Sequence, residues 1–178
     1  MDSGQFKREY WHRSLAGFAA EPQSGFGPLP SVDVLAQLLL DSFVNTPDHQ
    51  GKNLEQTKAE LSGTIAGTTS MSGAIAPLIS DASFAVYRNG EPISAIIVVA
   101  EKWGPHVPYL FTHPQYAGQG VATSLLKASA GALEKSGYQD IGLTVNLYNT
   151  RASNLYRHLG FQRRLGFKTV SGDKTNNT

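Results

Sequence analysis

The residues from Pro114 to Thr123 have the composition of an anion-binding turn. Their sequence, PQYAGQGVAT, contains Gly118 and Gly120 and lies between a strand-like run and a helix-like run. At such a junction the free N–H groups of the first helical turn and the helix dipole favour an anion, and glycine lets a phosphate approach the backbone. A Walker loop is excluded because no Gly-Lys-Ser/Thr follows, and a dinucleotide fingerprint lacks its third glycine. The alternative is a tight turn whose glycines serve only to pack the helix closely.

A second segment with residues suited to chemistry begins at Asn149 and reads NTRASNLYRHLGF. Asparagine is a favoured N-cap, and that structural duty alone could explain Asn149. Tyr156 carries a phenol whose reference pKa of about 10 allows it to donate a proton to a thiolate whose conjugate acid has a pKa near 8.5. The alternative for Tyr156 is a core tyrosine on an amphipathic helix face.

The two segments resemble the two signature motifs of the GNAT superfamily of acetyl-CoA-dependent N-acetyltransferases, and they occur in the same order and at the same separation as in that family. The resemblance covers roughly residues 82–165. The family motif is R/Q-x-x-G-x-G/A after a strand that ends V-x-P, and its second signature is Asn, Ala three residues on, Leu-Tyr and a closing Gly-Phe. Here Thr112-His113-Pro114 takes the V-x-P place. In the preferred register Ala117 replaces the leading Arg or Gln, while a shifted register that starts at Gln115 restores the glutamine but changes the spacing to Pro114 and to the helix.

The resemblance implies which residues hold acetyl-CoA, which would be the cosubstrate. The strand Leu110, Phe111 and Thr112 would splay from the next strand and pair with pantetheine, with the amide of Leu110 or Phe111 polarising the acetyl carbonyl. Asn149 would contact the cofactor arm, and Tyr156 would stand by the sulfur as the catalytic acid. The pyrophosphate would be bound mainly by backbone amides of the turn, at Ala117, Gly118, Gln119, Gly120, Val121, Ala122 and Thr123.

The general base is less defined. Some relatives carry a glutamate on the strand before Asn149, where this chain has Thr144, which cannot accept a proton at neutral pH. His106 is a candidate because its reference pKa is near neutral and it lies on the strand that leads to the turn. A chain of water molecules is an alternative to a side chain. Further candidates, each of which could equally be a solvated surface charge, are Glu101, Asp48, His49 and Glu60.

The resemblance implies a transferase that moves acetyl from acetyl-CoA to a primary amine of a small molecule, peptide or protein. The chain contains no cysteine, so the acyl group cannot pass through an enzyme thiol and transfer would be direct. No metal is expected. Two alternatives stay open: a noncatalytic acyl-CoA sensor, favoured by Thr144, and an N-acyltransferase for longer chains.

Composition limits the partners. Fifteen basic and fourteen acidic side chains give a net charge of +1, which offers no strong field for nucleic acid. The longest apolar run, residues 93–100, is shorter than the roughly 20 residues that cross a bilayer. No secretory signal is recognised, so we expect a cytoplasmic protein without membrane contact. A homodimer is common in the family.

The order of the elements predicts an α/β (α+β) fold with a mixed sheet, and the resemblance implies that this central sheet is mostly antiparallel and flanked by helices. Helical spacing follows Ser31 and covers residues 54–65, and the Asn89-Gly90 dipeptide predicts a hairpin over residues 82–101. Further strands are expected near residues 6–11, 106–112, 141–145 and 161–170, with helices after Gly120 and Asn149. We expect one domain over residues 1–178, with an irregular segment (1–30), a helical substrate side (31–80), an acetyl-CoA-binding core (82–170) and a tail (171–178).

Overall fold

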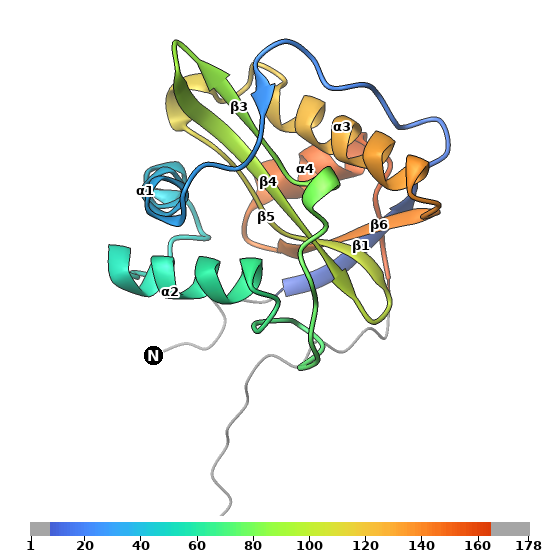
Figure 1. Ribbon diagram of the computed structural model, residues 1–178, viewed down its shortest axis with the longest axis horizontal. Coiled ribbons are helices and arrows are strands. Elements are labelled where there is room, and N and C mark those ends of the chain that lie inside the picture. Colours follow the sequence, from blue (N-terminus) through green and yellow to red (C-terminus); the bar gives the residue numbers. More distant parts are fainter. Residues whose placement is uncertain (1–7, 165–178) are drawn as a thin grey trace, which may run out of the picture.

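The computed structural model describes residues 8–164, which form one mixed sheet with helices on both faces (Figure 1). The seven strands lie in the order β2-β3-β4-β5-β6-β1-β7. Neighbouring strands are antiparallel except β5 and β6, which are parallel, so the predicted fold class is confirmed. The strands are β1 (Arg8–Ser14), β2 (Phe26–Gly27), β3 (Phe84–Arg88), β4 (Glu91–Glu101), β5 (Gly104–Thr112), β6 (Asp140–Asn146) and β7 (Gln162–Arg163).

The helices begin where the sequence places caps. Ser31 caps α1 by accepting a hydrogen bond from the Val34 amide, and Asn53 and Gln56 form a reciprocal capping box at the start of α2. Within the part of the chain that the structure describes, no helix combines the length and apolar character needed to cross a membrane. The helices are α1 (Val32–Phe43), α2 (Leu54–Ile65), α3 (Val121–Lys135) and α4 (Thr150–His158), with 3₁₀ turns η2 (Ser80–Ala82) and η3 (Pro114–Tyr116).

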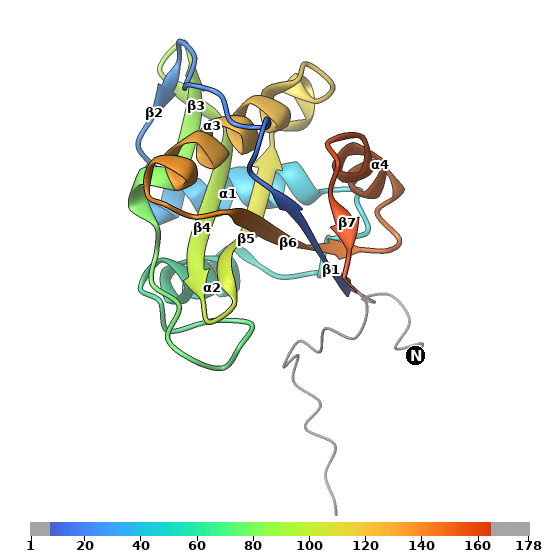
Figure 2. The ribbon, with the colours of Figure 1, turned by 90° about the vertical axis from the view of Figure 1, so that its right-hand side faces the viewer.

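The central strand β4 separates two hydrophobic cores. Ile96 and Val98 pack in the cluster that contains α3, whereas Ile97 and Val99 pack in the cluster that contains α1 and α2. Successive side chains of a strand point to opposite faces, so a strand covered on both sides is apolar throughout. Figure 2 shows α1 and α3 on opposite sides of the strands. The α1 and α2 layer therefore lies on the face away from the helix that follows the glycine turn.

The segment that was expected to be irregular contains two of the strands. β1 pairs along its whole length with β6, from Arg8 opposite Asn146 to Ser14 opposite Asp140, and its other edge pairs with β7. β2 is only two residues long and pairs with β3. The strand expected near residues 6–11 corresponds to β1, whereas the loop-like composition of residues 1–30 did not reveal β2, which long-range pairing with β3 creates. Residues 165–170 of the expected last strand and the tail 171–178 lie outside the described residues.

Close packing at Gly131 gives a test of the fold. A Cβ at this position in α3 would lie 2.7 Å from the backbone oxygen of Ala20, whose amide bonds to the Lys127 carbonyl at 3.0 Å. Gly131→Ala is therefore expected to lower the free energy of unfolding by about 1–3 kcal/mol through overpacking, although alanine is the better helix former. Urea unfolding measures this change. Gly63→Ala in α2 is the comparison, because its Cβ would meet the side-chain oxygen of Thr69, which can rotate; an equal loss in both variants would contradict the explanation.

Candidate active site

The strands β5 and β6 diverge and leave a gap in the sheet. Their parallel pairing is limited to His106 opposite Gly142 and Val107 opposite Leu143, although β5 stays paired with β4 as far as Thr112. The structure thus has the splayed pair of strands that the resemblance implied. The backbone of β5 beyond Val107 borders this gap, where an extended ligand could pair with it as an added strand.

The hydrogen bonds of β5 decide which of its backbone groups face the gap. The Phe111 carbonyl accepts from the Ser94 hydroxyl of β4 at 2.8 Å, and the His113 amide donates to the Ile93 carbonyl of β4 at 2.8 Å. Because backbone groups of alternate residues point to opposite edges of a strand, those of Leu110 and Thr112 face β6. Of the two amides considered for polarising an acyl carbonyl, Leu110 therefore offers its N–H to the gap, and Phe111 turns its N–H toward β4.

The glycine turn follows β5 and opens α3. Gly118 and Gly120 both have φ of +79°, and Gly120 is the N-cap of the helix. The first backbone hydrogen bond of the helix runs from the Ser124 amide to the Gly120 carbonyl at 3.0 Å. The amides of residues 121–123 therefore have no carbonyl partner within the helix. A Cβ on either glycine would meet nothing within 4 Å. This combination of free amides and open space suits a phosphate.

The turn is braced by a residue that the sequence did not single out. Arg88, at the end of β3, donates to the Gln119 side chain at 2.9 Å and lies over the Tyr116 ring, 5.1 Å from its centroid. The contact adds a guanidinium beside the amides. The shifted register of the family motif, with Gln115, Gly118 and Gly120, has the motif spacing, because Gln115 stands three residues before Gly118. Its last glycine directly precedes Val121, where α3 begins, so this register leaves the spacing to the helix intact.

A cavity of about 640 Å³ runs through the gap between the strands. It reaches from α4, at Asn149 and Tyr156, past the diverging ends of β5 and β6 to α2 and the loop after it. His106 is not among the residues that line it. Its charged and titratable lining residues are Arg8, Asp48, His49, Lys52, Glu60, Glu101, Tyr109 and Tyr156.

Tyr156, on α4, lines the cavity. Its ring is half-buried and packs edge to face against Phe161, with 5.7 Å between the ring centroids. Burial raises the pKa of Tyr156, and the nearby Asp48 carboxylate raises it further. The phenol is therefore protonated at neutral pH and can act only as a hydrogen-bond or proton donor toward an anion in the cavity.

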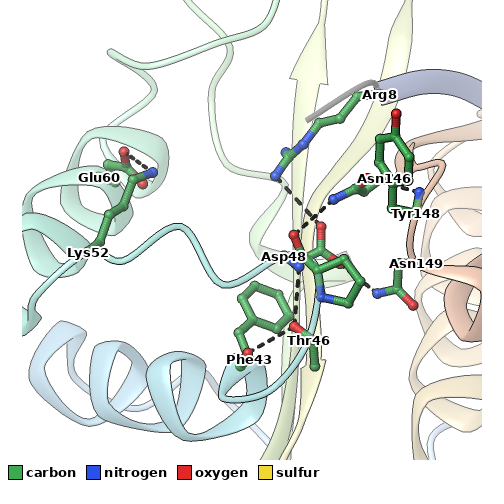
Figure 3. Close-up of polar contacts among 10 residues, drawn as sticks. Arg8, Phe43, Thr46, Asp48, Lys52, Glu60, Asn146, Tyr148 and Asn149 are labelled. Carbon is green, nitrogen blue, oxygen red and sulfur yellow. Dashed lines mark hydrogen bonds and ion pairs between the residues drawn. The ribbon is translucent and has the colours of Figure 1, made fainter. Parts of the chain in front are cut away.

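Asn149 links the helix cap to the loop between α1 and α2 (Figure 3). Its side-chain oxygen accepts from the Ala152 amide at 3.0 Å, and its side-chain nitrogen donates to Asp48 at 2.6 Å. Arg8 approaches the same carboxylate at 3.9 Å, and Asn146 donates to the Pro47 carbonyl at 3.1 Å. Asp48, one of the several candidate bases predicted from the sequence, is thereby held beside the start of α4.

His106 lies behind the cavity wall. It is fully buried, stacks on Tyr10 with the ring centroids 5.8 Å apart, and approaches the Thr144 hydroxyl with Nε2 at 3.2 Å. Burial lowers the pKa of His106 to about 3, so the imidazole is neutral at pH 7. Thr144 lines the cavity and stands between His106 and its interior. This position argues against direct contact between His106 and an amine, which a general base needs.

The other candidate bases, Asp48, His49, Glu60 and Glu101, all line the cavity. Glu60 pairs with Lys52 at 2.6 Å. Glu101, at the end of β4, is only 5% exposed, and one of its oxygens accepts from the Met71 amide at 2.8 Å. The cavity therefore carries three carboxylates against two basic side chains, which favours a cationic occupant.

The comparisons with known proteins agree with this geometry. Residues 80–163 match the model of the acetyltransferase (GNAT) domain, which spans the gap, the glycine turn and α4. A search of the curated proteins finds no match.

Solved structures of acetyltransferases share the fold. A GCN5-related N-acetyltransferase from Sphaerobacter thermophilus superposes with a TM-score of 0.59 at 16% identity, over 88% of this chain and 48% of that one, so this chain spans about half its length. The ribosomal-protein-S18-alanine N-acetyltransferase from Escherichia coli gives 0.54 at 22% identity, over 77% and 76%. An aminoglycoside 6'-N-acetyltransferase from Acinetobacter haemolyticus gives 0.58 at 16% identity, over 85% and 99%. At these identities the likeness establishes the fold alone.

Proposed function

The chain belongs to the GNAT acetyltransferase family, and on that premise we propose that it transfers an acetyl group from acetyl-CoA directly to a primary amine. The observation that carries the proposal is that one chain combines three features: the glycine turn at the start of α3, the gap between β5 and β6, and Tyr156 in the lining of the cavity that runs through this gap. The proposed acceptor is a primary amine of a small molecule, a peptide or a protein.

The turn and β5 supply the binding groups for the donor. The amides of residues 118–123 and Arg88 suit the pyrophosphate, and the gap-facing backbone of Leu110 and Thr112 suits the amide-bearing pantetheine arm. Acetyl-CoA supplies an activated acyl group as a thioester. The Leu110 amide would donate to the thioester oxygen, on which negative charge develops during attack.

The reaction needs two proton transfers, one carried out by Tyr156 and the other by Asp48. A C–N bond forms as the C–S bond breaks, the amine loses one proton and the thiolate gains one. Tyr156 donates to the leaving thiolate, because its raised pKa keeps the phenol protonated. Asp48 takes the amine proton, because Asn149 holds this cavity carboxylate beside the start of α4, the helix that carries Tyr156. Proton exchange through the cavity restores both groups.

The function is tested by calorimetry with acetyl-CoA and by thiol release with a panel of amines. Binding with amine-dependent release supports the transferase. Binding without release for any amine would favour the sensor, and equal turnover of longer thioesters would favour a less selective acyltransferase. A folded protein that ignores CoA thioesters would contradict all three.

A substitution at the turn tests where the donor binds. Gly120→Ala places a side chain in a left-handed conformation that costs about 1–2 kcal/mol and puts a methyl group into the space left for the anion, so the Kd for acetyl-CoA should rise about tenfold or more. The matched control is Gly137→Ala at the other end of α3, which has φ of +86° and open space beside it. Calorimetry should find weaker binding only in Gly120→Ala; equal affinities in the two variants would place the phosphates elsewhere.

A further inference from the structure

Glu101 is a buried carboxylate with one oxygen unused. Its Oε1 accepts from the Met71 amide at 2.8 Å, whereas Oε2 is buried with no hydrogen-bond partner. The side chain is 5% exposed and forms part of the cavity wall. A buried carboxylate oxygen without a donor is costly, so a cation bound at this wall would remove an existing penalty.

The other cavity carboxylates already have basic partners. Asp48 faces Arg8 at 3.9 Å, and Glu60 binds Lys52 at 2.6 Å. Among the ion pairs of residues 8–164, none involves Glu101. The excess negative charge of the cavity is therefore concentrated at Glu101.

Glu101 lies beside the end of β5 that is opposite to Leu110. It pairs with Gly104 at the β4–β5 turn, and Gly104 precedes Leu110 by six residues of β5. At about 3.3 Å per residue, these positions lie about 20 Å apart along the strand. A single ammonium group cannot occupy both ends, so a ligand that uses both must be extended.

We propose that the acceptor is an extended amine with a second cationic group, and that Glu101 binds this second cation while the primary amine lies near Leu110 and Tyr156. This inference rests on the proposed function and adds the substrate class. The Met71 amide fixes one oxygen of the carboxylate, which leaves Oε2 for the ligand. Glu101 is thus a specificity residue that acts at a distance from the reacting atoms.

Thiol-release kinetics with linear diamines of increasing length, matched monoamines and ω-amino acids test the proposal. Wild-type protein should use the best diamine with a kcat/KM about 10- to 100-fold above that of the matched monoamine, and should discriminate against the amino acid. Glu101→Gln should reduce the diamine preference to about one, through a rise in the KM for the diamine. Glu134→Gln, on the exposed side of α3, is the control and should behave as wild type.

Calorimetry separates the outcomes. Acetyl-CoA affinity should be equal in all variants, while diamine binding to the CoA-loaded protein should weaken only in Glu101→Gln. Wild-type protein without a diamine preference would overturn the inference even if Glu101→Gln fails to fold, and so would equal losses for diamine and monoamine. If diamine binding depends on Glu101 but no amine releases thiol, the cation site stands and the proposed function fails. If monoamines react without any diamine preference, the function stands and this inference fails.

Discussion

Tyr156→Phe is expected to lower kcat about 100-fold or more while the Kd for acetyl-CoA changes less than about threefold. The size follows from the contribution that a positioned general acid usually makes. The ring packs against Phe161 and would do so without its hydroxyl, so the wall of the cavity is retained. Stopped-flow or steady-state thiol release gives kcat, and calorimetry gives the affinity.

The same substitution at Tyr138 is the control, because that half-buried tyrosine packs against the α3 core and does not line the cavity. Tyr138→Phe should retain wild-type turnover. The pH profile gives a second readout: because the pKa of Tyr156 is raised, its ionisation should not limit the rate below about pH 10. A Tyr156→Phe variant with wild-type kcat would remove the phenol from the mechanism.

The sequence predicted the parts of the site that are encoded by neighbouring residues. Asn149 caps α4 and Tyr156 follows two turns later, and the two glycines of the turn directly precede α3, so each signal lies within one element and its cap. The bounds of α2, residues 54–65, were predicted from helical spacing, which is also a local signal. The assignment of the mostly antiparallel fold came from the resemblance rather than from pairing rules.

The missed features depend on contacts between distant residues. Glu101 meets Met71 across 30 positions, Arg88 meets Gln119 across 31, and His106 meets Thr144 across 38. Propensity and periodicity carry no information on such pairings, because tertiary packing decides them. His106 shows the consequence: its residue type and strand suggested a base, but the pairing of its strand places it in the core.

Acid should destabilise the protein through His106. The imidazole has a pKa of about 3 in the folded protein and about 6.5 in the unfolded chain, so the unfolded state binds more protons between these values. This contribution to the free energy of unfolding is fully present above pH 6.5 and falls as the pH is lowered, by about 1.4 kcal/mol per pH unit. At pH 4.5 the loss is about 3 kcal/mol, a large part of the stability of an ordinary domain.

Urea unfolding between pH 7 and pH 4 isolates this effect when wild type is compared with His106→Leu, which cannot take up the proton. The variant loses the contact with Thr144 and starts less stable, so the slope of stability with pH is the relevant quantity. Its curve should be flatter than that of wild type by about 1.4 kcal/mol per pH unit below pH 6.5. Parallel curves for wild type and His106→Leu would contradict this explanation and would mean that the imidazole is hydrated in the folded protein. Water would then reach His106 from the cavity past Thr144.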